Sequence, residues 1–369
     1  MTTIVIVREN LLTILQPLLS IVERRQTMAI LNNVLMDTFE NQLQVHGTDL
    51  EIQVKTRSPA EQISEPGSIL VSARKLHDIV RSLPENSLLT LDQRAGKMVI
   101  RSGKSRFNLL TQEGVVFPSM ARAQDEGKRI ILTQKLLKSL LERVQYAVAQ
   151  QDVRFYLNGT YLAIEDNQVT AVATDGHRMA YTTHQMDQSF DKVEAILPRR
   201  SVSELIKLLQ PNDEPVELIF HSTQVEFRFS KTEFLTKVIE GKYPDYQRVI
   251  PTTHYRHFTI SRLSLLQGLQ RASILSNDKV RGVRFLLTQG NLAIICSNSE
   301  QEEAHEELEV EYSQEPLDIG FNINYLLEVL QHLSVDQVTC SFGETGSSML
   351  ITLPSAELQF KYVVMPMRI

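Results

Sequence analysis

The pair of residues that most closely resembles catalytic machinery is Asp175 and His177, which a single glycine separates. A carboxylate next to a histidine can hold the imidazole ready to act as a general base. A hydrolase of this kind also needs a nucleophile, and the sequence has no serine or cysteine in a recognisable nucleophile elbow. The aspartate recurs as Asp49, 126 residues earlier and without a histidine, and an aspartate that caps a turn explains this recurrence better. The sequence therefore favours a protein that is not an enzyme.

The sequence offers few other candidates for metal or cofactor chemistry. Cys296 and Cys340 lack the short spacing of metal ligands, so we expect two buried thiols in a reducing compartment. There is no glycine-rich phosphate loop and no cluster of metal ligands, and we therefore expect no cofactor. The opening residues MTTIVIVREN lack the pattern of a signal peptide, and no apolar run approaches the ~18 residues of a membrane span. These features predict a cytoplasmic protein.

Landmarks of three kinds recur along the chain at nearly the same interval. The leucines of a helix opening at Leu11 and Leu12 recur 125 residues later, and again 129 residues after that. A second helix repeats at nearly the same interval. The turn that ends in Asp49 matches the turn that ends in Asp175, and Phe117-Pro118 matches Tyr243-Pro244. An interval near 126 residues exceeds a solenoid repeat and fits a whole small domain.

We therefore divide the 369 residues into three tandem domains, 1–125, 126–251 and 252–369. The repeated apolar faces predict six helices, at 8–25, 72–83, 134–148, 199–209, 262–279 and 322–335. Alternating apolar and polar residues predict strands at Gln42–Val54, Leu88–Ile100, Tyr161–Val172, Val216–Phe229, Asn291–Cys296 and Met349–Leu353. The expected fold class is α+β, with three copies of a domain that has two helices and a mostly antiparallel sheet.

The distribution of charge separates these helices from the rest of the chain. The protein has a net charge of −6, which argues against a general nucleic-acid-binding protein. Five of the six expected helices are nevertheless net positive, and together the six carry +8 against −14 elsewhere. A basic helix face is often only a solvated surface, but this bias in an acidic protein favours a shared anionic partner.

Domain size limits how such a chain could surround a partner. A domain of about 120 residues has a radius of gyration of about 14 Å, and hence a diameter of roughly 35 Å. A ring of three such domains leaves a hole of roughly 5 Å, whereas six leave a hole of roughly 35 Å, which is wide enough for duplex DNA. If the chain encircles DNA, we therefore expect a dimer in which domain one of one chain meets domain three of the other.

Five segments spread along the chain carry a family resemblance. They are Gln151–Gly159 (QDVRFYLNG), Ala173–Arg178 (ATDGHR), Tyr243–Tyr246 (YPDY), Ile274–Asn277 (ILSN) and Tyr362–Arg368 (YVVMPMR). In order and spacing they resemble the bacterial DNA polymerase III β subunit family, the sliding clamps. The resemblance implies a head-to-tail homodimer that forms a six-domain ring around duplex DNA, with helices lining the hole. It also implies a non-catalytic tether for the replicative polymerase.

The resemblance further implies a pocket that binds short linear peptides of polymerases, the clamp loader and repair proteins. The matching positions are Leu157, Thr174, Gly176, His177, Arg178, Met179, Pro244, Arg248, Val249, Ser348, Val363, Val364, Met365, Pro366, Met367 and Arg368. The residue types also favour a peptide-binding surface. The terminus VVMPMRI places two flexible methionine side chains beside a rigid proline, and methionine suits a surface that must fit several peptides. A C-terminal strand docked into its own core is the alternative, and both readings can hold together.

A dimer seam and a DNA-facing surface are implied in the same way. The seam positions are Lys75, Lys104, Arg106, Phe107 and Leu109 in domain one, and Ile274, Leu275, Glu300, Glu302, Glu303, Glu306 and Glu307 in domain three. Unlike charges at the two ends would orient the chains, although an acidic run is often only a solvated face. The DNA-facing positions are Arg25, Gln151, Arg199, Arg200 and Lys207, followed by Lys135, Lys138 and Arg271.

The sequence departs from the family in two places, and one other class of protein stays open. Gln26, Ala29 and Asn32 replace the usual Pro, Pro and Gly after Arg25, and Met179 and Ile369 replace leucines. The second pair nearly conserves side-chain volume. A repeat-built scaffold that binds peptides without encircling DNA is the alternative, and it gives no reason for five basic helices.

Overall fold

The computed structural model describes residues 2–22, 28–112, 116–277, 279–344, 346–354 and 359–369. The chain forms two compact units. The first comprises Met1–Leu137 and Ser203–Val238, and the second comprises Lys138–Val202 and Ile239–Ile369. The divisions after residues 137 and 202 fall inside helices α3 (Gln134–Glu142) and α4 (Arg199–Leu208).

The first unit contains a 13-stranded sheet in the order β10-β13-β14-β15-β4-β3-β2-β6-β9-β8-β7-β1-β5. Its strands are β1 (Thr3–Val7), β2 (Asn33–Phe39), β3 (Gln42–Thr48), β4 (Ile52–Pro59), β5 (Gln62–Ile63), β6 (Ser68–Ser72), β7 (Leu88–Arg94), β8 (Lys97–Ser102), β9 (Ser105–Gln112), β10 (Lys128–Thr133), β13 (Pro215–Phe220), β14 (Gln224–Phe229) and β15 (Thr232–Lys237). Strand β15 pairs antiparallel with β4, and Phe234 lies opposite Val54. The sheet therefore runs without a break from the first expected domain into the second.

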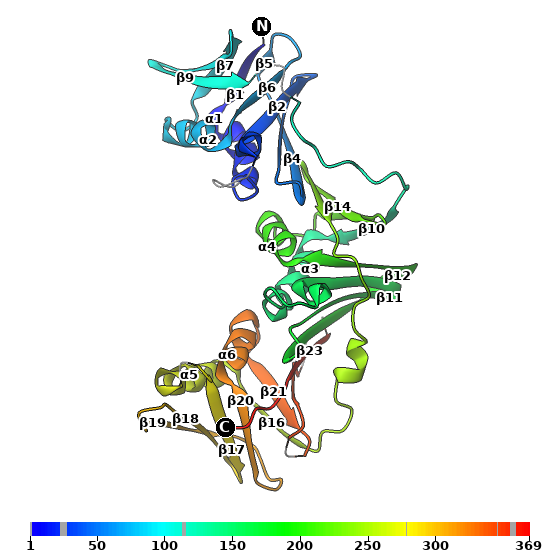
Figure 1. Cartoon of the computed structure of the whole chain (residues 1–369), viewed down its shortest axis with the longest axis vertical. Coiled ribbons are helices and arrows are strands. Elements are labelled where there is room, and N and C mark those ends of the chain that lie inside the picture. The colour runs from blue at the N-terminus through cyan, green and yellow to red at the C-terminus, as the bar shows by residue number, and fades with distance from the viewer. Residues whose placement is uncertain (1, 23–27, 113–115, 278, 345, 355–358) are drawn as a thin grey trace. The chain divides into compact units, whose positions relative to one another are not determined.

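Helices α1 (Arg8–Leu15) and α2 (Ala73–Ser82) pack against each other and against strands of this sheet (Figure 1). In α2 the buried residues Ala73, Leu76 and Val80 recur at the helical spacing, so one apolar face meets the core. Leu83 is extended because Pro84 follows it, and α2 ends there.

The second unit contains a six-stranded sheet in the order β11-β12-β23-β22-β21-β16 and a four-stranded sheet in the order β19-β18-β17-β20. Their strands are β11 (Gly159–Thr174), β12 (Arg178–Pro198), β16 (Arg256–Ser261), β17 (Gly282–Thr288), β18 (Asn291–Ser297), β19 (Glu303–Glu309), β20 (Leu317–Asn322), β21 (Gln337–Phe342), β22 (Met349–Thr352) and β23 (Gln359–Val364). Strand β12 pairs antiparallel with the C-terminal strand β23, and Arg178 lies opposite Val364. The second and third expected domains therefore also share a sheet.

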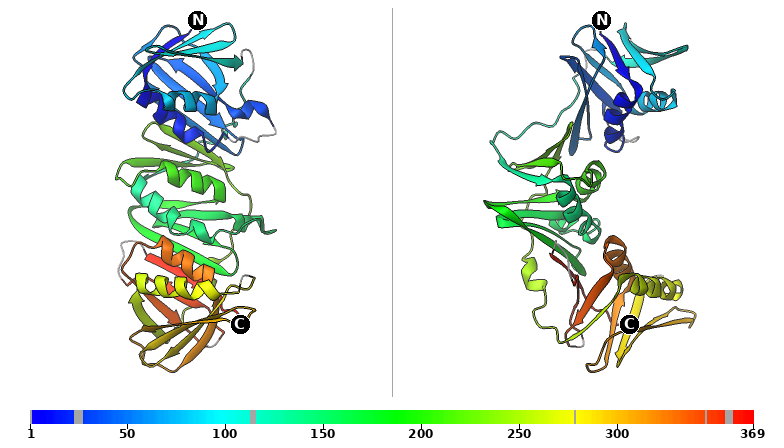
Figure 2. Two further views of the ribbon diagram at one scale, coloured as in Figure 1. Left: turned by 90° about the vertical axis from the view of Figure 1, so that its left-hand side faces the viewer. Right: turned by 180° about the vertical axis from the view of Figure 1, so that it is seen from behind.

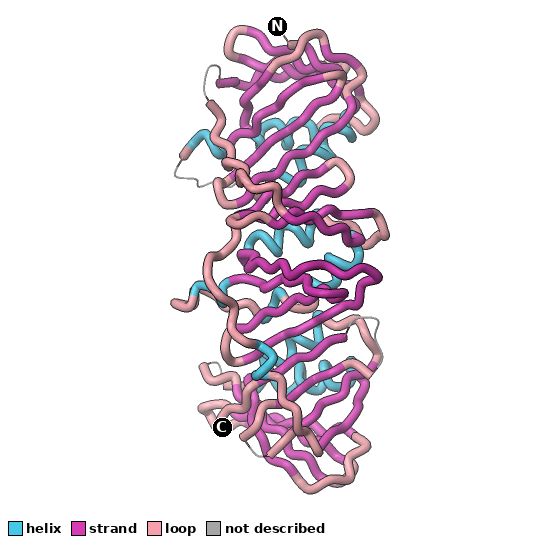
Figure 3. The backbone as a smooth tube through the Cα atoms, turned by 90° about the vertical axis from the view of Figure 1, so that its right-hand side faces the viewer, coloured by secondary structure: helices cyan, strands magenta, loops and turns pink. Residues whose placement is uncertain are grey.

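Helices α5 (Arg262–Ala272) and α6 (Ile323–His332) lie side by side in the second unit (Figure 2). The side chains of Ser261 and Asn322 cap their first turns by accepting from the N–H groups of Ser264 and Asn324. Seen from the side opposite to the left view of Figure 2, the sheet strands of each unit lie in front of its α-helices (Figure 3). The expected α+β class with antiparallel sheets is confirmed, since every strand pair of the described residues is antiparallel.

The first helix of each expected pair is shorter than predicted. Helices α1, α3 and α5 end at Leu15, Glu142 and Ala272, and a 3₁₀ turn follows at Gln16–Leu18, Gln145–Ala147 and Ser273–Leu275. In the first copy Pro17 has no N–H to donate back along the helix, which explains why the α-helix stops. The 3₁₀ turn is itself a repeated feature, because it occupies the same place in all three copies.

Three of the expected strands are hairpins. Gln42–Val54 is divided between β3 and β4, Leu88–Ile100 between β7 and β8, and Val216–Phe229 between β13 and β14. At the second of these turns Ala95 and Gly96 both have positive φ, as a tight two-residue hairpin requires. Alternation alone did not reveal these turns, because the apolar residues keep their spacing on both sides.

Both cysteines are buried and unpaired with each other, as predicted. Burial raises the pKa of Cys296 to about 11 and the pKa of Cys340 to about 12, so neither is a reactive thiolate at neutral pH. Within the described part of the chain, no helix has the length and apolar character needed to cross a bilayer.

Candidate functional site

The turn that joins β11 to β12 is closed by side chains of Thr174 and Asp175. The Asp175 carboxylate accepts from the backbone N–H groups of His177 (2.9 Å) and Arg178 (3.0 Å). The Thr174 hydroxyl donates to the carbonyl of Arg178 and accepts from the N–H of Gly176. Residue 176 has a φ of +88°, which glycine adopts without strain.

The same turn closes the β3–β4 hairpin of the first copy. Asp49 accepts from the N–H groups of Glu51 and Ile52, and the Thr48 hydroxyl donates to the carbonyl of Ile52. Leu50 holds the position of Gly176 at a φ of +74°. The prediction that this aspartate caps a turn is therefore confirmed in both copies.

The role of Asp175 in the turn also answers the question of catalysis. Its carboxylate is directed to two backbone N–H groups and to the guanidinium of Arg178, with 3.1 Å between Arg178 Nε and Asp175 Oδ2. It does not orient the imidazole of the exposed His177 as a catalytic dyad would. Asp175 and His177 therefore build the turn rather than a reaction centre.

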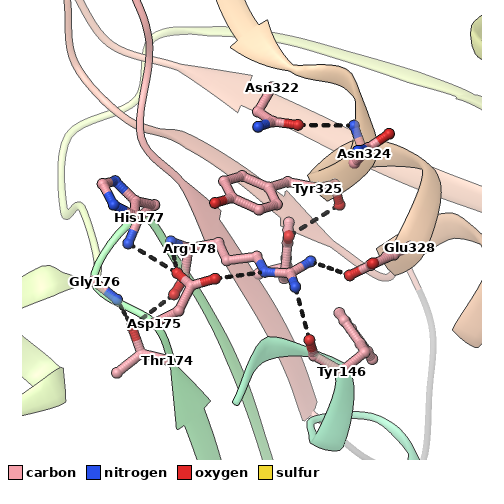
Figure 4. Close-up of polar contacts among 11 residues, drawn as sticks. Tyr146, Thr174, Asp175, Gly176, His177, Arg178, Asn322, Asn324, Tyr325 and Glu328 are labelled. Atoms are coloured by element: carbon pink, nitrogen blue, oxygen red, sulfur yellow. Dashed lines mark hydrogen bonds and ion pairs between the residues drawn. The ribbon is translucent and has the colours of Figure 1, made fainter. Parts of the chain in front are cut away.

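Arg178, at the start of β12, is the most enclosed charge of the site (Figure 4). It is 8% exposed, and its guanidinium donates to Asp175, to the Glu328 carboxylate and to the carbonyl of Tyr146 (2.7 Å). The ring of Tyr325 lies 4.4 Å below the guanidinium. Burial alone would lower the pKa of Arg178, but the Tyr362 hydroxyl and the Glu328 carboxylate outweigh it and raise the pKa. The arginine therefore stays charged.

These contacts connect three elements that are distant in the sequence. Tyr146 belongs to the 3₁₀ turn after α3, and Tyr325 and Glu328 belong to α6. The Tyr146 ring stacks on His332 of the same helix, with 4.6 Å between ring centroids. The Tyr362 hydroxyl of β23 donates to the carbonyl of Tyr325 (2.9 Å). Arg178 thus fixes the β11–β12 turn against α6.

The C-terminal segment lies beside this turn. After β23 ends at Val364, the N–H of Met365 donates to the carbonyl of His177 (2.9 Å), and the N–H of Met367 donates to the carbonyl of Gly320 (2.8 Å). Met365 is 47% exposed. An apolar side chain is therefore held at the surface by backbone hydrogen bonds on both sides of it.

The predicted pocket residues form a buried floor and an exposed rim. Leu157, Met179, Val363 and Val364 are buried, and Met179 and Val363 belong to an apolar cluster with Tyr161 and Tyr243. Exposed residues of the predicted set are Gly176, His177, Pro244, Arg248, Val249, Met365 and Arg368, while Thr174, Ser348, Pro366 and Met367 are half-buried. Arg248 forms an ion pair with Asp245, with 2.8 Å between Nε and Oδ2. All these residues lie in the second unit, and the contacts above join the turn directly to the C-terminal segment.

Comparison with known proteins gives the same family along the whole chain. Residues 2–121, 131–245 and 247–368 match the N-terminal, central and C-terminal domains of the DNA polymerase III beta subunit. The beta sliding clamp of Pseudomonas putida is 39% identical over 366 residues, and that of Escherichia coli K12 is 38% identical over 362 residues. Each alignment covers 98% of both chains. The chain belongs to the DNA polymerase III β subunit family.

Solved structures agree with this assignment. A crystal structure of the Pseudomonas aeruginosa sliding clamp with a ligand has a TM-score of 0.95 and 38% identity, and a second, bound to griselimycin, has 0.95 and 39%. Both comparisons cover 100% of each chain. The chain is therefore a DNA sliding clamp built from three tandem clamp domains, which tethers the polymerase and catalyses no reaction.

The DNA-facing positions expected for this clamp family differ in their surroundings. Arg199 and Arg200 begin α4, where the helix dipole disfavours cations, so their presence there needs a reason other than helix stability. Lys207 pairs with Glu204 (2.8 Å), and Arg271 makes a bidentate pair with Glu306. Gln151 and Lys135 are exposed, Lys138 is half-buried, and Arg25 lies outside the described residues.

The seam positions expected for the clamp family are mostly at the surface. Ile274 is 78% exposed, and Lys75, Lys104, Arg106, Glu300, Glu302, Glu303 and Glu307 are also exposed, while Phe107, Leu275 and Glu306 are half-buried. Leu109 is only 8% exposed, because Phe107 and Leu109 share the inner face of β9, whereas Leu110 on the other face is 76% exposed. The alternation of inward and outward residues along SRFNLLTQ could have predicted from the sequence that Leu110, and not Leu109, is the exposed leucine.

Sequence reasoning missed the partners that hold Arg178. Glu328 and Tyr146 lie 150 and 32 residues away from it, and no local pattern marks either as a neighbour. It also missed Gly320, which receives the Met367 hydrogen bond. The repeat could have pointed to the segment that holds Tyr146, because the 3₁₀ turn recurs after the first helix of every copy.

Proposed function

We propose that two copies of this clamp close head to tail into a ring of six domains, with helices lining a hole that holds duplex DNA. The domains are 1–125, 126–251 and 252–369, and the family matches overlap them in order. A cytoplasmic homodimer without cofactor, which meets DNA without regard to its sequence, follows from this proposal. The proposed DNA contacts are Arg25, Gln151, Arg199, Arg200 and Lys207, supported by the two arginines at the start of α4.

The observation that carries the ring is a pair of open strand edges. Strand β19 is at the edge of its sheet, and residues 105–110 of β9 pair only with β8 among the described strands. An open edge offers unpaired N–H and C=O groups to a second chain. The β9 edge carries Arg106 beside Lys104, and the β19 edge begins at Glu303, so the charges favour pairing of unlike edges. Ile274 and Leu110 supply exposed apolar surface near these edges.

Replacing Ile274 with aspartate is expected to raise the dimer dissociation constant at least tenfold. The substitution would bury an unpaired carboxylate in the seam, and even 1.4 kcal/mol corresponds to a factor of ten. Sedimentation velocity over a concentration series measures the effect. Val153→Asp is the matched control, because Val153 is 93% exposed in the central domain and should leave the dimer intact. An unchanged dissociation constant for the Ile274 variant would remove this residue from the seam.

The ring itself is tested by topology. Clamp loaded onto a nicked circular plasmid by a clamp loader and ATP should remain bound during gel filtration in high salt, and should be lost when a restriction enzyme linearises the plasmid. A ring can slide off an end, whereas binding by phosphate contacts alone depends on salt and not on ends. Equal retention on circular and linear DNA would contradict encirclement.

The second part of the proposal is the peptide pocket. Its floor is the cluster around Met179 and Val363, and its rim includes His177, Pro244, Val249 and Met365. An exposed methionine beside a rigid proline suits a surface that binds several related peptides. Griselimycin is bound to a Pseudomonas aeruginosa clamp that is 39% identical to this chain, and we propose that it binds here too. Peptide motifs of the replicative polymerase, the clamp loader and repair proteins are the proposed natural ligands.

A further inference from the structure

The last five residues leave the six-stranded sheet and cross to the four-stranded sheet of the same unit. Met365 is hydrogen-bonded to His177, and Met367 to Gly320 of β20. Ile369 then lies over Gly282 of β17 and Gly320, which are on paired strands. Figure 1 shows the C-terminus beside β17 and β20. The segment is therefore attached at one end to the β11–β12 turn and at the other to a different sheet.

A side chain at either glycine would crowd this segment, and at position 320 part of the segment would have to shift. A Cβ atom at position 320 would lie 2.5 Å from Ile369 Cδ1 and 2.6 Å from the Met367 carbonyl oxygen. A Cβ atom at position 282 would lie 3.2 Å from both Cδ1 and Cγ1 of Ile369. Neither glycine has a positive φ, so the backbone does not require glycine at either position. Glycine is needed at these positions because the absence of a side chain lets the C-terminal segment lie this close to the two strands.

The C-terminal residues need close contacts of this kind to stay ordered. Terminal residues usually fray, because few contacts offset the backbone entropy that ordering costs. Ile369 is 63% exposed, so burial of its side chain contributes little by itself. The close approach allowed by Gly320 lets the Met367 N–H reach the backbone carbonyl at 2.8 Å. That hydrogen bond and the contact of Ile369 with the two glycines hold the segment together.

We propose that Gly320 and Gly282 are positioning residues of the peptide pocket, and we call them the glycine seat. They hold Met367 and Ile369 in place, and thereby keep Met365 beside His177 on the pocket rim. The inference rests on the proposed function of the pocket, and it adds that peptide binding depends on the position of the C-terminal segment. The pocket is complete only while the C-terminal segment occupies the glycine seat, so release of the segment lowers affinity without any change in the floor.

The test compares Gly320→Ala and Gly282→Ala by two independent measurements. Isothermal titration with griselimycin measures the pocket, and the rate at which carboxypeptidase A removes Ile369, followed by mass spectrometry, measures the segment. Gly320→Ala is expected to weaken griselimycin binding at least tenfold and to speed removal of Ile369 by a similar factor. At Gly282 the three atoms nearest to a new Cβ belong to the Ile369 side chain and not to the backbone, and a weakening of about threefold is expected.

A double-mutant comparison separates the two glycines. In an Ile369→Ala background, Gly282→Ala should have no further effect, because the three atoms nearest to the new Cβ, all of the Ile369 side chain, have been removed. Gly320→Ala should still weaken binding in that background, because the Met367 carbonyl remains. Gly268→Ala is the control, since this glycine of α5 faces Leu308 and Ile294 of the same four-stranded sheet and not the C-terminal segment. It should change neither measurement.

The outcomes are distinguishable. Faster removal of Ile369 with unchanged griselimycin affinity would overturn the link between the glycine seat and the pocket. Unchanged removal in both glycine variants would overturn the glycine seat itself. If the unmodified clamp does not bind griselimycin, the pocket proposal fails, while the carboxypeptidase measurement still reports on the glycine seat. Thermal melting confirms folding, and Gly282→Ala with Ile369→Ala decides the question if Gly320→Ala fails to fold.

Discussion

Replacing Arg178 with alanine is expected to lower the free energy of unfolding by about 3 kcal/mol, because the variant loses several charge-assisted hydrogen bonds at once. The carbonyl of Tyr146 would lose a donor in the interior, and Asp175 and Glu328 would lose their shared cation. The stacking contact with Tyr325 would also go. Griselimycin binding should weaken as well, since the β11–β12 turn would no longer be fixed against α6. Urea denaturation at one fixed protein concentration measures the stability change.

Arg154→Ala is the matched control for this experiment. Its guanidinium donates to Asp152 and lowers the pKa of that carboxyl to about 2, yet the arginine side chain is 48% exposed. Exposed ion pairs contribute little, so the urea midpoint should be almost unchanged. Arg178→Lys keeps the charge but cannot reach three acceptors with a planar fork, and its midpoint should fall between those of Arg178→Ala and the unmodified clamp. Equal midpoints for Arg178→Ala and Arg154→Ala would contradict the structural role given to Arg178.

The parts of the fold that repeat were the parts that the sequence could predict. The turn of Thr174 and Asp175 copies that of Thr48 and Asp49 in each hydrogen bond between these side chains and the backbone, so the pattern identified the turn and its capping aspartate. The apolar faces of α2 and its counterparts placed the helices in the same way. Local rules suffice where each copy solves the same packing problem with residues close in sequence.

The features that distinguish the copies depend on contacts between distant segments. Nothing near Glu328 indicates an arginine 150 residues earlier, and nothing near Gly320 indicates the C-terminus. The predicted lengths of the first helices were wrong for a different reason. The apolar spacing of α1 continues past Leu15, but Pro17 removes the donor that the next helical turn needs. Periodicity records which face is buried, and it does not record whether each backbone group has a partner.

Deleting Met367–Ile369 is expected to weaken griselimycin binding at least a hundredfold while leaving the dimer and the melting temperature unchanged. The deletion removes the hydrogen bond to Gly320 and the contact with the glycine seat, and it leaves the hydrogen bond between Met365 and His177 in place. Strand β23 ends at Val364, so it keeps its pairing with β12 and β22 in the six-stranded sheet. Titration calorimetry measures the affinity, and sedimentation velocity measures the dimer.

Ile369→Leu separates loss of the segment from loss of one side-chain shape. Leucine conserves the volume of isoleucine, so griselimycin affinity should stay within about twofold of the unmodified value. Unchanged affinity in the deletion variant would refute the assignment of Met365 and its neighbours to the pocket. Loss of the dimer together with the affinity would instead mean that the segment supports the whole domain. The deletion therefore tests whether the pocket rim is a separate addition to a repeated scaffold, because such a rim can be removed while all three copies remain folded.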